Sequence, residues 1–151
     1  MGRFVVAGAA LALLAGCHAQ PVARLEVRDA WVRLAAVPGR PAAAYFNLAG
    51  AATADRLVAV TSPKVATIEL HGGGMSDGMM TMRKLDGVDV PVGGSVAFAP
   101  GGNHAMLFGV DPSVKPNATL PLSFRFASGA RMDVAAATVN AGGDAPDHGA
   151  H

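Results

Sequence analysis

Histidine and methionine residues gather in two short stretches of the chain. His71 begins the first, and His104 with Met106 forms the second. The methionines that follow His71 are Met75, Met79, Met80 and Met82. Imidazole and thioether donors together select soft or borderline transition metals and favour Cu(I), whereas zinc prefers thiolate, imidazole or carboxylate and calcium or magnesium prefers oxygen. The residue types therefore predict a soft-metal site.

A simpler interpretation is that methionine fills the core and the histidines are incidental. This interpretation suits Met132, but it does not suit the segment from Met75 to Met82. That segment follows the glycine run of Gly72, Gly73 and Gly74 and contains Ser76, Asp77, Gly78 and Thr81. We therefore expect the methionines to lie on a glycine-rich polar loop beside His71, where thioethers are available to a metal.

The spacing of the donors adds a geometric expectation. Residues two apart on a strand point to the same face, so His104 and Met106 are expected to present their donor atoms together, as are Met80 and Met82. Cys17 is the single cysteine of the chain. A blue-copper site, which needs a thiolate, and a CxxC redox pair are thereby excluded.

Length and composition indicate the kind of domain that must position these donors. The 151 residues suit one domain, and 51% of them are hydrophobic against 15% charged, which argues against disorder. The 19 glycines and 10 prolines favour many short elements joined by turns. A net charge of +1 gives no electrostatic basis for binding nucleic acid.

Short apolar stretches separated by turn residues predict eight or nine strands. The clearest is 119–126, where leucine and phenylalanine alternate with other residues, followed by a hairpin turn into 132–134. The other expected strands are 25–33, 44–48, 56–61, 67–71, 79–83, 95–99 and 105–110. We expect one all-β domain, an antiparallel sandwich or barrel, without internal repeat.

The first residues are typical of a lipoprotein signal peptide. A charged start and a short apolar run end in Leu14-Ala15-Gly16-Cys17, which resembles a bacterial lipobox. The alternative is an ordinary signal peptide with an incidental cysteine. We expect a signal peptide over 1–16, an acylated Cys17 that starts a tether over 17–23, a domain over 24–139 and a flexible tail over 140–151. The protein would be anchored to a membrane of the cell envelope by lipid.

The donor spacing resembles that of the periplasmic copper chaperones called PCuAC. His71, Met82, His104 and Met106 follow the pattern H-x10-M-x21-H-x-M. The neighbouring text is similar over about residues 24–139, as in Asp29-Ala30-Trp31, Asp55-Arg56-Leu57-Val58 and Gly101-Gly102-Asn103-His104-Ala105-Met106-Leu107. One departure is Gly72, where members often carry Met or Glu. Met75, Met79 or Met80 could supply the missing donor.

The resemblance implies a cupredoxin-like (Greek-key) β-sandwich that binds one Cu(I) near its surface through these four residues. It also implies delivery of copper to respiratory oxidase assembly, in particular the dinuclear copper site of cytochrome c oxidase. The expected partners are a copper-accepting oxidase subunit or another copper chaperone, and the expected state is a periplasmic, lipid-anchored monomer without enzymatic activity.

Two other classes of protein remain as alternatives. An Ig-like envelope lipoprotein that binds proteins without metal would leave the four donors far apart in the fold. A hydrolase using His71 or His104 lacks a nucleophile elbow, a zincin helix and a cysteine nucleophile. Separately, the tail residues Asp147, His148 and His151 are donors suited to Cu(II), although they could equally be solvated side chains.

Overall fold

The computed structural model describes residues 1–2 and 23–147, and the described chain is all-β. No helix in this part of the chain is long and apolar enough to cross a membrane. The ten strands are β1 (Glu26–Arg33), β2 (Ala42–Ala49), β3 (Asp55–Thr61), β4 (Val65–Ser76), β5 (Met79–Leu85), β6 (Val88–Val90), β7 (Ser95–Phe98), β8 (His104–Val110), β9 (Thr119–Phe126) and β10 (Arg131–Val139).

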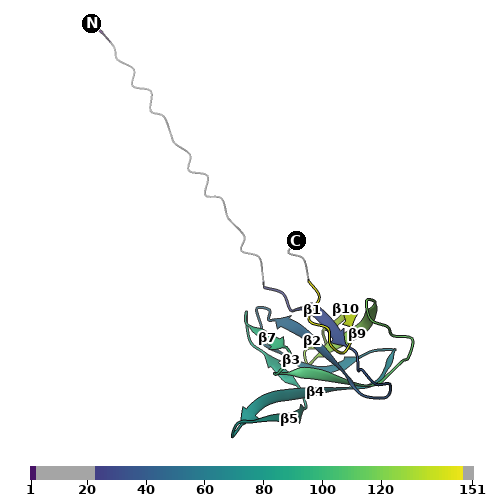
Figure 1. Ribbon diagram of the computed structural model, residues 1–151. Coiled ribbons are helices and arrows are strands. Elements are labelled where there is room, and N and C mark those ends of the chain that lie inside the picture. The colour runs from purple at the N-terminus through teal and green to yellow at the C-terminus, as the bar shows by residue number, and fades with distance from the viewer. Residues whose placement is uncertain (3–22, 148–151) are drawn as a thin grey trace.

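The strands follow the order β5-β4-β8-β2-β1-β10-β9-β3-β6, and β7 also pairs with β2 (Figure 1). Side chains of β2 and β7 meet side chains of β9 in the core. The ring of Phe46 on β2 stacks on Phe98 at 4.3 Å and meets Phe124 of β9 edge-on at 4.8 Å between centroids. The sheet is therefore folded over on itself as a sandwich, as expected.

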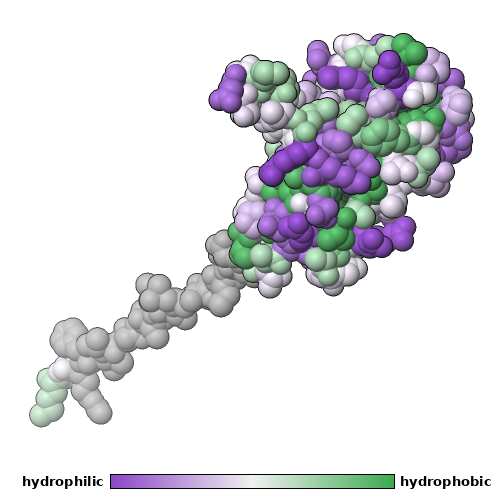
Figure 2. Space-filling view, turned by 90° about the horizontal axis from the view of Figure 1, so that it is seen from below, coloured by the Kyte–Doolittle hydropathy of each residue, from purple (hydrophilic) through white to green (hydrophobic). Residues whose placement is uncertain are grey.

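Alternation along the strands explains this core. Leu120, Leu122, Phe124 and Phe126 of β9 are buried, as are Ala42, Ala44, Phe46 and Leu48 of β2. Each set occupies every second position, so one face of each strand is removed from water. Figure 2 shows one face of the molecule, on which hydrophilic and hydrophobic residues are interspersed.

Two features differ from the sequence-based expectation. Strands β1 and β10 pair in parallel, with Trp31 opposite Ala137, although an antiparallel sheet was predicted. A parallel pair needs a long connection, and here the rest of the domain supplies it. The expected strand over 67–71 also runs on to Ser76, so the predicted glycine-rich loop is wrong. Gly72, Gly73 and Gly74 pair with Arg83, Met82 and Thr81 of β5, so they belong to a strand.

The segment after β10 is held against the sheet at its start. The Arg33 Nε donates a hydrogen bond to the Gly143 carbonyl oxygen at 2.9 Å, and the guanidinium lies over the rings of Trp31 and Tyr45 at 5.1 and 5.6 Å. The tail over 140–151 was expected to be flexible, and this hydrogen bond joins its beginning to β1. Residues 3–16 of the expected signal peptide, Cys17, His148 and His151 lie outside the described residues.

Candidate metal centre

A tight hairpin joins β4 to β5 at the lower edge of the molecule in Figure 1. The turn residues are Asp77, with φ 49°, and Gly78, with φ 76°. Positive φ at both central positions is the signature of a type I′ turn, for which the Asp-Gly pair is favoured. This turn fixes the register of the hairpin, in which Gly73 lies opposite Met82 and Met75 opposite Met80.

Strand β4 pairs with β8 on its other side. His71 lies directly opposite His104, and Glu69 lies opposite Met106. Because side chains two residues apart share a face of the sheet, the two registers place His71, Met82, His104 and Met106 on one face of β5-β4-β8. The opposite face of β8 carries Ala105 and Leu107, which are fully buried in the core.

A shallow cavity of about 220 Å³ opens on this outer face. Met82, His104 and Met106 line it together with Met80. Gly73 and Gly102, which have no side chains, also line it. The Met82 side chain is 59% exposed, whereas that of His71 is 14% exposed. On this face the imidazole of His71 is therefore largely buried, whereas the thioether of Met82 is exposed to solvent.

The hydrogen bonds of the two imidazoles leave one nitrogen free on each ring. His104 Nδ1 lies 3.0 Å from the Gly102 carbonyl oxygen, which can only accept, so Nδ1 carries the proton and Nε2 is free. His71 Nε2 lies 3.1 Å from Glu69 Oε2 and donates to the carboxylate. His71 Nδ1 is buried and has no hydrogen-bond partner among the described residues.

Glu69 is ionised and shared between two donors. It accepts a hydrogen bond from Lys84 Nζ at 2.9 Å as well as from His71. The hydrogen bond from Lys84, followed by that from His71, lowers the pKa of Glu69 below its ordinary value. A carboxylate that holds the far nitrogen of a histidine is the arrangement that orients imidazole ligands in metal sites.

The separation of the two rings matches a shared ion. Their centroids are 5.6 Å apart and their planes are tilted by 38°. With metal–nitrogen bonds of about 2 Å, an ion lies about 3 Å from each ring centre, which places two bound rings about 5–6 Å apart. The two imidazoles therefore lie close enough to bind one ion. Met82 and Met106 lie on the same face of the sheet, whereas His71 is not among the residues that line the cavity.

Gly73 is required by a close approach of two backbones. A Cβ at this position would lie 2.5 Å from the Gly102 carbonyl oxygen, which is the oxygen that orients His104. Gly73, Gly102 and Glu69 were not singled out from the sequence. Glu69 could have been found, because the rule that aligned His104 with Met106 also places residue 69 on the face of His71.

The structure separates the three additional methionines that the sequence suggested. Met75 and Met80 lie on the face of the cavity, directly opposite each other. Met79 lies opposite Ser76, on the other face of the hairpin. All three are exposed, at 68%, 64% and 71%. Asp147 of the tail is exposed as well, and the structure gives it no contact with the cavity.

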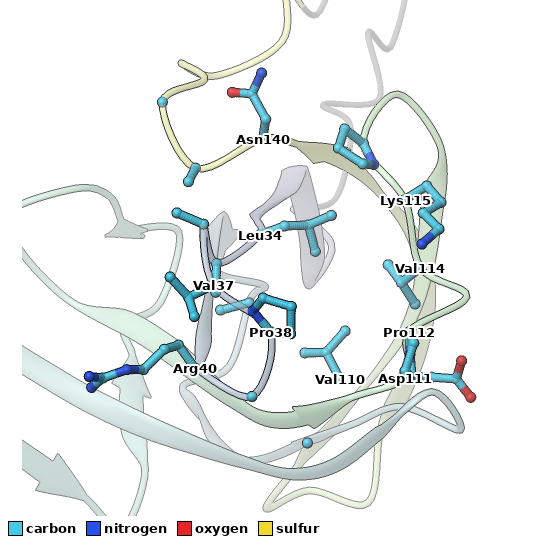
Figure 3. A pocket seen from close by; sticks show the side chains of 18 residues that line it. Leu34, Val37, Pro38, Arg40, Val110, Asp111, Pro112, Val114, Lys115 and Asn140 are labelled. Atoms are coloured by element: carbon cyan, nitrogen blue, oxygen red, sulfur yellow. The ribbon is translucent and has the colours of Figure 1, made fainter.

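Other parts of the described chain provide no comparable donor set. Within residues 1–2 and 23–147, no group of three or more His, Cys, Asp or Glu side chains is placed to hold a metal. A larger cavity of about 750 Å³ lies where β8 ends, and Figure 3 shows Val37, Pro38 and Val110 around it. Neither histidine nor methionine is among its lining residues.

Two comparisons with known protein sequences found matches. A family described as "Putative lipoprotein LpqE-like" matches residues 25–139. The "Putative lipoprotein Lxx21020" of Leifsonia xyli subsp. xyli is 30% identical over 112 residues, which span 74% of this chain and 67% of that protein.

Solved structures share the fold. The copper-bound PCuAC domain from PmoF2 superposes with a TM-score of 0.66 at 20% identity, over 80% of this chain and 97% of that domain. The solution structure of CuI-DR1885 from Deinococcus radiodurans gives a TM-score of 0.59 at 25% identity, over 83% of each chain. The sandwich described above is thus the fold of PCuAC domains.

Proposed function

The chain belongs to the LpqE-like lipoprotein family, and from this membership and the site geometry we propose that it is an extracytoplasmic copper chaperone. In this proposal one Cu(I) ion is its cargo, bound by His71, Met82, His104 and Met106. The similarity in fold to PCuAC domains, two of them described as copper-bound or CuI forms, supports the choice of metal.

The observation that carries the proposal is the buried, unpartnered Nδ1 of His71. A buried polar atom without a partner is unfavourable, and a bound metal ion removes that penalty. His104 Nε2 and two thioethers on the same face complete a donor set of two nitrogens and two sulfurs. Such neutral, soft ligands favour Cu(I). A metal-free protein-binding module would have left these four residues far apart.

The exposure of the site suits transfer of copper rather than catalysis. Met82 and Met80 are open to solvent, so an incoming ligand can reach the ion before the old ligands leave. Thioethers bind Cu(I) less strongly than thiolates, so movement to a thiolate-bearing acceptor is downhill. We propose an oxidase copper site, the dinuclear site of cytochrome c oxidase, or another copper chaperone as the acceptor. The protein is a carrier and not an enzyme.

The cellular location rests on the N-terminal sequence and on the family. We propose that residues 1–16 are removed, that Cys17 is acylated, and that 17–23 tether the domain over 24–139 to a membrane of the cell envelope. The family and the Leifsonia protein are both described as lipoproteins, which supports an envelope location.

The tail is proposed as a separate, secondary copper site. Asp147, His148 and His151 offer carboxylate and imidazole donors, which suit Cu(II) better than Cu(I). Deleting residues 144–151, which keeps the Gly143 contact with Arg33, should remove a Cu(II) signal from the electron paramagnetic resonance spectrum. An unchanged spectrum would exclude the tail from copper binding.

An anaerobic titration tests the main site. The purified full chain, in detergent, competes for Cu(I) with a chromogenic chelator, and we expect one high-affinity Cu(I) per protein. His104→Ala and Met106→Leu each remove a donor and should weaken binding by about 10-fold or more. Met79→Leu, on the other face of the hairpin, is the matched control and should bind as the parent does. Donor variants that titrate like the control would overturn the assignment.

A further inference from the structure

The outer end of the β4–β5 hairpin carries a pair of thioethers that the four-ligand site does not use. Met75 and Met80 lie directly opposite each other, two residues beyond the pair formed by Gly73 and Met82. Their side chains are 68% and 64% exposed, so neither contributes a buried surface to the core. Their place in the hairpin therefore has no evident role in stability.

The two sulfur atoms can reach a single ion. Side chains directly opposite each other on antiparallel strands have Cβ atoms about 5 Å apart. Each methionine has three rotatable bonds and an adaptable thioether. Neither sulfur is charged, and neither needs a hydrogen bond, so the pair can open and close around a soft cation at little cost.

The pair is continuous with the cavity. Successive positions on one face of a strand are about 6.7 Å apart, so an ion held by Met75 and Met80 lies one step from Met82. Met80 also lines the cavity that contains Met82, His104 and Met106. One methionine is thus available to both positions.

We infer that Met75 and Met80 form an outer Cu(I) position, which receives the ion from a donor molecule and passes it inward to Met82 and the two histidines. This inference rests on the proposed function and adds an entry step to it. During each transfer one copper–ligand bond forms as another breaks. Every ligand exchanged within the protein is neutral, the ion remains Cu(I), and neither electron nor proton is transferred between protein groups.

The rate of copper uptake tests this step. The full chain in detergent is mixed anaerobically with a Cu(I) complex of a chromogenic chelator, and the loss of the chelator complex is followed by stopped-flow absorbance. Met75→Leu keeps the size and apolar character of an exposed side chain outside the cavity. We expect uptake to slow by about tenfold or more, because the ion is no longer held near the inner ligands.

Met79→Leu is the control, since Met79 is exposed on the same hairpin but faces the other way. It should load at the parental rate. In protein labelled with ¹³C at the methionine methyl groups, substoichiometric Cu(I) should broaden the Met75 and Met80 signals and leave Met79 sharp.

The outcomes separate this inference from the proposed function. If the parent binds no Cu(I) at equilibrium, the proposed function fails and the outer position with it. If the parent binds Cu(I) but Met75→Leu loads at the parental rate, only the outer position is wrong. Equal slowing by Met79→Leu would also overturn it, because any exposed thioether would then serve.

Discussion

Replacing Gly73 by alanine tests how the metal-site face is shaped. The new Cβ would lie 2.5 Å from the Gly102 carbonyl oxygen, which must withdraw by about 0.9 Å to reach the 3.4 Å of ordinary contact. That oxygen accepts the hydrogen bond from His104 Nδ1 at 3.0 Å. Its withdrawal either breaks this bond, since N–H···O bonds weaken beyond about 3.2 Å, or pulls the imidazole ring with it.

The expected magnitude follows from the loss of this orienting contact. Removal of a partner that orients a metal-bound histidine lowers metal affinity by about 10–100-fold, so Gly73→Ala should weaken Cu(I) binding by that factor. The chain also loses a net hydrogen-bond contribution of about 1 kcal/mol from its free energy of unfolding. Competition with a Cu(I) chelator measures the first effect, and urea denaturation of the metal-free protein measures the second.

Gly72→Ala provides the matched control one residue away. Its Cβ would point to the other face of β4 and meet the Leu85 side chain at 3.3 Å, where a flexible methyl group can give way. We expect its Cu(I) affinity to stay within about threefold of the parent, well below the effect of losing an orienting contact. If the two alanine variants bind Cu(I) equally well, the contact between Gly73 and Gly102 does not position His104 and the reasoning is refuted.

Three further predictions address other parts of the molecule. Glu69→Gln should lower Cu(I) affinity by about 10–100-fold, because a neutral amide no longer holds His71 in one tautomer; long-range ¹H–¹⁵N spectra that still show a single Nε2–H tautomer would contradict this. The pKa of Asp55 is lowered from 3.8, chiefly by the hydrogen bond from the Ser128 hydroxyl. The ionised Asp55 therefore stabilises the fold fully above pH 3.8, and this contribution is lost as the pH falls through the lower pKa of the folded state. Asp55→Asn should make the free energy of unfolding, measured by urea titration, depend less on pH in the acid range. Finally, Cys17→Ser should abolish labelling by a fatty-acid analogue, and a serine variant that stays on membranes would disprove the anchor.

The sequence predicted the parts of the fold that depend on local alternation. Leucine and phenylalanine at every second position of 119–126 define β9, and the buried pattern agrees with it residue by residue. Glycine shows no such alternation, since it has no side chain to assign to a face. For this reason Gly72, Gly73 and Gly74 were expected to form a loop, although backbone pairing with β5 makes them part of a strand.

The pairing of strands that are far apart in the sequence could not be predicted from local patterns. Nothing near Trp31 indicates that it lies beside Ala137 in a parallel pair, because that register depends on how the whole chain closes. The four donors were selected by residue type and spacing, which gave their identity but not their hydrogen bonds. Alternation alone places Glu69 on the face of His71, whereas the contact of Gly102 with Gly73 depends on long-range strand pairing that no local pattern shows.

The position of β5 at the end of the sheet gives the candidate site two unequal halves. His71, His104 and Met106 lie on β4 and β8, which are flanked by neighbours on both sides, whereas Met82 lies on an edge strand that pairs with β4 alone among the described strands. Edge strands open locally at lower free energy than interior strands. Separation of β5 from β4, beginning at the turn, would move the thioether of Met82 away and leave the two imidazoles in place. An ion bound by Met82 and the two imidazoles would link β5 to β4 and β8. Its removal would make local opening of β5 easier and leave the rest of the sandwich folded.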